Sequence, residues 1–258
     1  MSAADAGRPG ERSGTLERGL LLLQFFAAAG EATPAEAAKA TGLSRSATYR
    51  IADRLRGWGF LELNPATEGL RLGSEAVRLG MAALASLEVT GVAPPYLRAL
   101  ADQTRETVNL AVVDGDTVVY IHKEEGTVAV KMTAQLGTRR PLHCTALGKA
   151  YLAALPSREL EARLAGLELA RFTAATITDL ASLEAELDRV RRRGFAVDQE
   201  EVEEGVYCLG AAIRDHRQVP VAAISVAGPA YRVRAKADQV GALVAETAAA
   251  ISRRLGHR

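Results

Sequence analysis

The sequence predicts an α+β protein in which an N-terminal winged helix-turn-helix and a linker helix precede a larger mixed domain. Three observations support this prediction. Residues 33–72 contain two capped helices followed by a hairpin pattern, residues from 74 onward form an amphipathic helix, and short apolar strands alternate with helices after residue 96. With 258 residues, 48% of them hydrophobic, the chain is long enough for one large or two moderate domains. We expect domains at 15–73, 74–93 and 94–258.

The first 14 residues are rich in Gly, Ser, Ala and charge, and they lack the apolar core of a signal peptide. We expect a disordered arm there, and then a helix that Thr15 caps and Gly30 ends. Its apolar run from Leu20 is interrupted by Gln24 and is shorter than the roughly 20 residues of a membrane span, which favours a buried helix and no membrane partner. The predicted packing stripe is Leu16, Leu20, Leu23 and Ala27.

Residues 33–42 predict a short helix with clear ends. Thr33 is a suitable N-cap, and Pro34 occupies the first helical position, where a missing N–H costs nothing. Gly42 is suited to end the helix, and Ser44 to cap the next one after a tight turn. This order of elements is typical of a helix-turn-helix.

The second helix has an apolar stripe and a basic outer face. Ala47, Ile51 and Leu55 recur every four residues. Residues 44–58 carry four arginines against one acid, a local charge of 4 − 1 = +3. A solvated basic face is the ordinary alternative, but the capped helix before it and the hairpin after it favour DNA binding.

A small hairpin, or wing, is expected where residues 60–64 and 70–72 flank the turn cluster at 65–69. In such a motif the second helix enters the major groove of double-stranded DNA, and flanking arginines meet phosphates. Thr48 leans toward the core on the helical wheel, so it is the weakest of the candidates. The predicted DNA contacts are Ser44, Arg45, Ser46, Thr48, Tyr49, Arg50, Arg54 and, in the wing, Arg71.

The helix that Ser74 opens has an apolar stripe without a partner in the small domain. The stripe is Val77, Met81, Leu84 and Leu87. It fits either a dimerising linker or a helix that packs on the chain's own second domain.

The second domain is expected to be a sheet flanked by helices. Pro94 and Pro95 break the linker, and a helix follows at 96–106. Strands are predicted at 108–113 and 117–122 across the Asp114-Gly115 pair, and at 127–132, 195–198, 206–213 and 221–227. Further helices are predicted near 146–155, from a Ser157 cap, at 179–193 before Gly194, and from about Ala235 with Val240, Leu243, Val244, Thr247 and Ile251 on one side.

Charge and cysteine content limit the function classes. The net charge of 32 − 31 = +1 gives no global attraction to nucleic acid or membrane, so binding must come from a local patch. The two cysteines, Cys144 and Cys208, have no paired spacing, which argues against a disulfide framework or a zinc site and suits a reducing cytoplasm. We expect neither a metal nor a cofactor.

Six segments together resemble the isocitrate lyase regulator (IclR) family of bacterial transcription factors, over nearly the whole chain from Thr15 to Leu255. The segments are LERGL at 16–20, LSRSATYR at 43–50, TVNLA at 107–111, PLHCTALGKA at 141–150, RRGFAVDQEE at 192–201 and AISVAGPA at 223–230. The resemblance implies a C-terminal effector-binding domain of GAF-like fold. It also implies a repressor or activator that binds a short palindromic operator as a dimer or a dimer of dimers.

The resemblance also implies an effector pocket. The matching positions are Met132, Arg140, Thr145, Ala146, Leu147, Asp198, Cys208, Ser225 and Ala227. Backbone N–H groups at the start of the helix near Thr145 would suit a carboxylate, and Asp198 would accept a hydrogen bond from a ligand hydroxyl. Ala227 and Arg140 depart from relatives that bind small polar acids, which favours a larger or more apolar acid paired with Arg140.

Ordinary structural roles stay open for several of these positions. Cys208 and Ser225 fit a strand core, Asp198 fits a solvated acidic turn with the acids that follow it, and Lys149 fits a surface position. Two other functions are alternatives. His143 and Cys144 are adjacent but would point to opposite faces of an extended segment, which disfavours a cysteine-dependent enzyme, and a redox sensor would act through Cys144 or Cys208.

Overall fold

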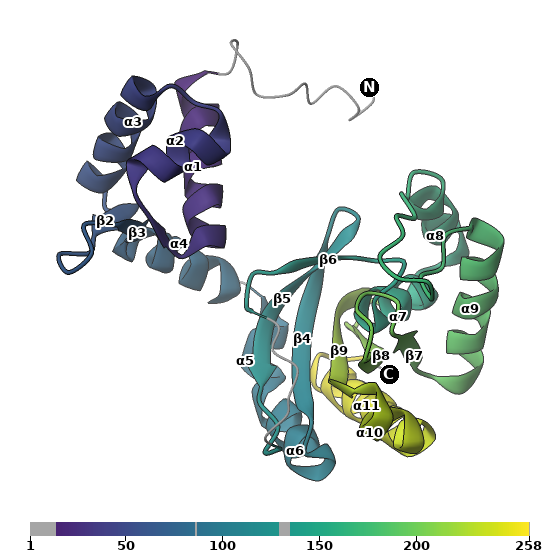
Figure 1. The fold of residues 1–258 in the computed structure, drawn as a ribbon. Coiled ribbons are helices and arrows are strands. Elements are labelled where there is room, and N and C mark those ends of the chain that lie inside the picture. The colour runs from purple at the N-terminus through teal and green to yellow at the C-terminus, as the bar shows by residue number, and fades with distance from the viewer. Residues whose placement is uncertain (1–13, 86, 129–134, 258) are drawn as a thin grey trace. The chain divides into compact units, whose positions relative to one another are not determined.

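The computed structural model describes residues 14–85, 87–128 and 135–257, in two compact units, Met1–Ser86 and Leu87–Arg258 (Figure 1). Residues 1–13 of the arm predicted at 1–14 lie outside the described residues, as do Met132 and most of the strand predicted at 127–132. Each unit has its own hydrophobic core.

The first unit is a winged helix-turn-helix. Its helices are α1 (Thr15–Ala29), α2 (Pro34–Thr41) and α3 (Arg45–Gly57), and its sheet has the order β1-β3-β2, with β1 at Glu31–Ala32, β2 at Leu61–Leu63 and β3 at Leu70–Leu72. The predicted Thr33 cap, the Gly42 end and the hairpin are confirmed. The short strand β1, which pairs with β3, was not predicted because two residues carry no periodicity.

The predicted packing stripe of α1 is wrong at three of its four positions, and only Leu23 packs against the core, partly buried. Leu16, Leu20 and Ala27 are exposed, whereas Leu22 and Phe26 are fully buried against Ile51 and the sheet. Leucines surround most of this helix, so periodicity alone could not select the buried face. Gly14, not Thr15, is the N-cap residue.

Two helices replace the single linker helix predicted at 74–93. They are α4 (Ser74–Ala85) and α5 (Glu88–Val92), and Leu87 between them has an extended backbone with φ −94° and ψ 108°. In the α4 stripe, Val77 and Met81 are exposed, and no residue of α4 is buried. The helical path is therefore interrupted at Leu87, where the second unit begins.

The second unit contains a six-stranded antiparallel sheet of order β6-β5-β4-β9-β8-β7. In this order the strands are Arg139–Pro141, Thr117–Glu124, Thr107–Asp114, Pro220–Pro229, Val206–Arg214 and Ala196–Gln199. The β4–β5 loop is Gly115-Asp116, one residue later than the predicted pair, because Asp114 pairs with Thr117 and Gly115 takes the positive φ of 56°.

Helices cover both faces of this sheet and enclose two cores. On one face α6 (Pro94–Thr104) and α11 (Ala237–Arg254) pack on Leu110, Ile224 and neighbouring residues. On the other face lie α7 (Ala146–Ala154), α8 (Ser157–Leu164) and α9 (Leu180–Arg193), which Figure 1 shows in green. The sheet flanked by helices is confirmed.

Helix boundaries in the second unit differ from the predictions in three places. The prolines predicted to precede the helix at 96–106 lie in its first turn, so α6 begins at Pro94 and ends at Thr104. Ser157 is the first residue of α8 and does not cap it, since Pro156 takes the N-cap position. Before α11 the chain forms a short helix α10 (Ala230–Val233) and a 3₁₀ turn (Arg234–Lys236). The end of α9 at Gly194 is confirmed, and Asp179, predicted as its first residue, is its N-cap.

Candidate functional site

The outer face of α3 presents unpaired arginines. Ser44 caps the helix by accepting a hydrogen bond from the Ala47 N–H at 3.3 Å. Arg45, Arg50 and Arg54 are exposed, and none forms an ion pair within residues 14–85 of the described chain. Ser46 and Tyr49 lie on the same exposed face.

One predicted DNA contact, Thr48, needs correction, and a second, Arg71, has an acidic partner. Thr48 is fully buried, and its hydroxyl donates to the Ser44 carbonyl at 3.1 Å, so this side chain supports the turn and cannot reach a ligand. Arg71 lies, as predicted, in the wing, on β3, where it is exposed and its Nε donates to Glu62 Oε1 at 2.7 Å. The carboxylate of Glu62 therefore neutralises part of the positive charge that Arg71 was predicted to offer to a DNA phosphate.

The second unit holds a cavity of about 90 Å³ between the sheet and the start of α7. The sheet register explains why distant residues meet there, because Ala227, Cys208 and Asp198 pair in turn across β9, β8 and β7, and Ser225 of β9 pairs with Asn109 of β4. The predicted positions that line the cavity are Arg140, Thr145, Ala146, Leu147, Asp198, Cys208, Ser225 and Ala227. The lining residues that were not predicted are Asn109, Tyr120, Val202, Glu203 and Val206.

Two glycines let α7 approach the cavity closely. A Cβ at Gly210 on β8 would lie 2.7 Å from the Ala146 carbonyl oxygen, and a Cβ at Gly148 would lie 2.2 Å from the Leu142 carbonyl oxygen. Both contacts are shorter than van der Waals distance, so larger residues would push the helix away from the sheet. The N-terminus of α7 is thereby held directly against β8.

The start of α7 carries the donors expected of an anion site. Thr145 Oγ1 donates to the Pro141 carbonyl at 2.9 Å and accepts from the Gly148 N–H at 3.0 Å. Within the described residues, the N–H groups of Ala146 and Leu147 have no acceptor. Arg140, on β6 at the rim, is exposed and forms no ion pair with any described side chain. A ligand carboxylate would find two N–H groups and one cation here.

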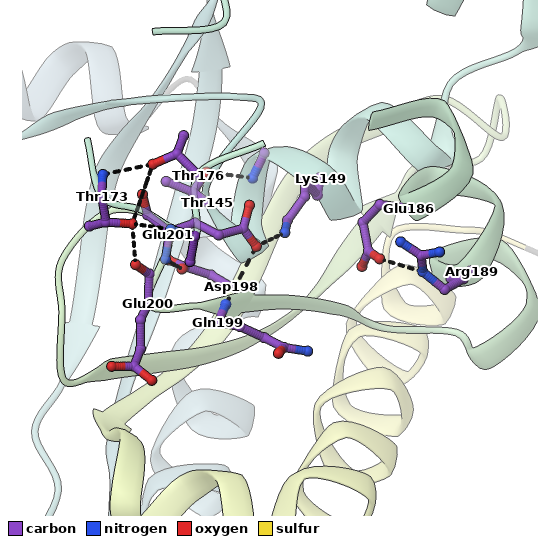
Figure 2. A network of polar contacts seen from close by, with 12 residues as sticks. Thr145, Lys149, Thr173, Thr176, Glu186, Arg189, Asp198, Gln199, Glu200 and Glu201 are labelled. Atoms are coloured by element: carbon purple, nitrogen blue, oxygen red, sulfur yellow. Dashed lines mark hydrogen bonds and ion pairs between the residues drawn. The ribbon is translucent and has the colours of Figure 1, made fainter. Parts of the chain in front are cut away.

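A buried charge cluster lies next to Asp198, which lines the cavity. Lys149 of α7 is 1% exposed, and its Nζ pairs with Glu201 Oε1, as Figure 2 shows. Glu201 also donates its N–H to Asp198 Oδ1 at 2.8 Å, and its carbonyl accepts from Thr176 Oγ1 at 2.6 Å. Two alternatives that the sequence left open, a surface position for Lys149 and a solvated acidic turn at Asp198, are therefore wrong. Lys149, Asp198 and Glu201 are buried.

Asp198 is the cavity residue with the most perturbed ionisation. Burial raises its pKa from the ordinary aspartate value to about 7, against the opposing effects of Lys149 and the Glu201 N–H. Glu201 adds to this increase through its own negative charge. The carboxyl group of Asp198 therefore changes charge near neutral pH.

Replacing Asp198 with asparagine is expected to change the pH dependence of stability. The folded protein holds the Asp198 proton more tightly than the unfolded chain, so this group makes the parent less stable as the pH rises from about 4 to about 7. Asp198→Asn does not titrate, so its stability relative to the parent should rise between pH 5 and 8 in urea unfolding. Asp102→Asn, at an exposed position of α6, is the control. If the stabilities of Asp198→Asn and the parent changed with pH in the same way, the raised pKa of Asp198 would be refuted.

Comparisons with known proteins agree over both units. A family model described as IclR helix-turn-helix domain matches residues 15–65, and one described as bacterial transcriptional regulator IclR C-terminal matches residues 81–253. The chain is 36% identical to the HTH-type transcriptional repressor AllR of Klebsiella pneumoniae, over 97% of this chain and 95% of that protein. It is 33% identical to the HTH-type transcriptional regulator XynR of Escherichia coli, over 94% and 97%.

The chain belongs to the IclR family. Among solved structures, the Thermotoga maritima IclR matches with a TM-score of 0.79 and 34% identity, covering 94% of this chain and 99% of that one. An IclR homolog from Microbacterium hydrocarbonoxydans, complexed with 4-hydroxybenzoate, matches with a TM-score of 0.82 at 24% identity, over 94% and 99%. The resemblance predicted from the six segments is confirmed, and the relatives are regulators of transcription.

Side-chain chemistry disfavours the enzyme and the redox sensor for this IclR-family chain. Burial raises the pKa of the Cys144 thiol to about 12 and that of the Cys208 thiol well above its ordinary value, so neither provides a reactive thiolate. His143 is buried with its pKa lowered, and its Nε2 lies 3.0 Å from the Ala170 carbonyl oxygen. Within the described residues, no group of three or more His, Cys, Asp or Glu is arranged to hold a metal ion, and no helix is long and apolar enough to cross a membrane.

Proposed function

We propose that this IclR-family protein is a ligand-responsive transcriptional regulator that binds a palindromic operator and takes a small organic or aromatic acid in the cavity of its second unit. The observation that carries the proposal is the enclosed space at the start of α7, where two free N–H groups and Arg140 face the polar sheet residues. Such a pocket suits a carboxylate at one end and a hydrogen-bonding group at the other.

The proposed DNA contacts are Ser44, Arg45, Ser46, Tyr49, Arg50 and Arg54, with Arg71 as a weaker phosphate contact. A palindromic site requires two recognition helices related by a two-fold axis, so we propose that the protein acts as a homodimer or a dimer of dimers. The relatives named repressors support this reading, and binding of the acid would shift the equilibrium between two arrangements with different operator affinity.

The chemistry of the cavity points to an acid with an apolar body. Ala227 and Cys208 provide no strong hydrogen-bond donor at the sheet, while Arg140 at the rim provides a positive charge. The distant homolog whose fold matches that of this chain was solved with 4-hydroxybenzoate, which is an acid of this kind. The effector residues that we propose are those that line the cavity.

Selection of binding sites from random duplexes with the full-length protein tests the proposal. We expect an enriched palindrome whose affinity falls steeply between 50 and 200 mM salt, by about 10³-fold or more if six or more phosphates are contacted. In thermal unfolding, at least one member of a panel of organic and aromatic acids should raise the unfolding temperature and change operator affinity. Enrichment of no site refutes the DNA-binding proposal, and a panel without any stabilising acid refutes the proposed effector class.

A further inference from the structure

Asn109, the third residue of β4, is a buried polar residue whose side-chain oxygen has no hydrogen-bond partner among the described residues. Its side chain is 3% exposed and lines the cavity. Its Oδ1 accepts no hydrogen bond, and its carboxamide forms none with any side chain or backbone group of the described residues. A buried amide group without a partner is costly and rare in folded proteins, so its presence in a cavity wall points to a ligand.

The neighbours of Asn109 place it close to the proposed carboxylate position. Asn109 pairs across the sheet with Ser225 of β9, and Ser225 pairs with Gly210 of β8. Gly210 is the residue on which the start of α7 rests, since its Cβ would lie 3.1 Å from the Leu147 nitrogen. The row from Gly210 to Asn109 therefore leads from the free N–H groups of α7 along the cavity floor.

A second unpartnered group provides a comparison. Thr107 lies two residues before Asn109 on the same face of β4, is 1% exposed, and has an Oγ1 without a partner. Thr107 does not line the cavity. The two residues thus share burial and an unmet hydrogen bond, but only Asn109 can meet a molecule in the cavity.

We infer that Asn109 is a specificity-determining residue, whose carboxamide hydrogen-bonds a polar substituent of the effector. This inference rests on the proposed function. The ligand class is an organic acid with an apolar body and one further hydroxyl, oxo or amido group: the carboxylate lies at the N-terminus of α7, and the second polar group lies over Asn109 and Ser225. A carboxamide offers both a donor and an acceptor, so it accommodates a hydroxyl, a keto oxygen or an amide. An acid that lacks this group leaves the buried amide unpaired and is rejected.

The first test uses the ligand-free, full-length protein. Asn109→Leu replaces the carboxamide with an apolar group of similar branching, and Thr107→Val does the same for the neighbouring hydroxyl. Because neither polar group has a partner, both variants should unfold at the same temperature as the parent or a few degrees above it. A decrease of more than about 5 °C for Asn109→Leu alone would identify Asn109 as a structural residue and overturn the inference.

The second test measures binding of matched acids by calorimetry. The probe pairs are acetate and glycolate, propionate and lactate, and benzoate and 4-hydroxybenzoate. For a pair that binds, the parent and Thr107→Val should prefer the hydroxy acid by roughly tenfold or more, and Asn109→Leu should bind both members within about twofold.

Two outcomes of this test have separate meanings. Acids that bind the parent without preference, or a preference that survives in Asn109→Leu, would overturn the role of Asn109 and leave the proposed function standing. Failure of every acid to bind the parent would refute the proposed effector class, and the inference would fall with it.

Discussion

Replacing Lys149 with methionine is expected to destabilise the second unit strongly, by about 3–5 kcal/mol. Lys149 is 1% exposed, and Glu201, its partner, is 6% exposed at the side chain. Without the ammonium group, the Glu201 carboxylate stays buried with no positive charge beside it. In thermal unfolding of the full chain, the transition of this unit should fall by roughly 10 °C.

Two controls separate charge from packing. Glu201→Gln combined with Lys149→Met removes both charges and should recover most of the lost stability, because an uncharged pair carries no buried ion. Burial already raises the pKa of Glu201 in the parent, with Lys149 opposing the increase. In Lys149→Met the carboxyl should therefore take up a proton more readily, so the destabilisation should be smaller at pH 5 than at pH 8. Equal destabilisation at both pH values, without recovery in the double variant, would show that lost packing is the cause.

Local signals in the sequence were sufficient to predict helix ends, where a hydrogen bond to a nearby backbone group fixes the structure. The caps at Thr33 and Ser44 and the helix end at Gly194 have the predicted side-chain or backbone geometry. These features depend on residues three or four positions apart, so a single sequence contains all the information that they need.

Tertiary contacts explain the errors. Lys149 and Glu201 are 52 positions apart, and only the folding of α7 over β7 brings them into a buried pair. A lysine or a run of acids in a sequence is normally solvated, and nothing local indicates otherwise. The prediction of the α1 packing stripe was wrong for a related reason. Helix α1 has several apolar faces, and the positions of α3 and the sheet determine which face is buried.

The cavity was only partly predictable. Eight lining positions came from the family resemblance, whereas Asn109 was missed although a signal was present: it is a polar residue at an inward position of a strand whose neighbours Val108 and Leu110 are apolar. Alternation of side chains places Asn109 on the face opposite to theirs, with Ala111. A polar residue in a strand that is apolar on both faces is a candidate for binding, and this pattern alone could have identified it.

The change expected to weaken DNA binding most is the double substitution Arg45→Ala and Arg50→Ala. Both arginines are exposed on α3 and lack carboxylate partners in the described part of the first unit, so each is free for a base edge or a phosphate. A base contact contributes about 1–3 kcal/mol, and a phosphate contact also lowers the salt dependence by about one unit of slope. The double variant should therefore bind the selected site about 100-fold more weakly at 150 mM salt.

The matched control must remove a positive charge without touching α3. Arg158 lies exposed on α8 of the second unit, and Arg158→Ala changes the net charge of +1 by the same single unit as each α3 variant. If only the total charge of the chain governed binding, all single variants would behave alike; if the face of α3 enters the groove, Arg158→Ala should bind like the parent. Fluorescence anisotropy over a salt series distinguishes the two cases, because a lost phosphate contact changes the slope and a lost base contact changes the preference between sites. Parental affinity in Arg45→Ala and Arg50→Ala would mean that α3 is not the recognition helix, whatever the fold of the unit.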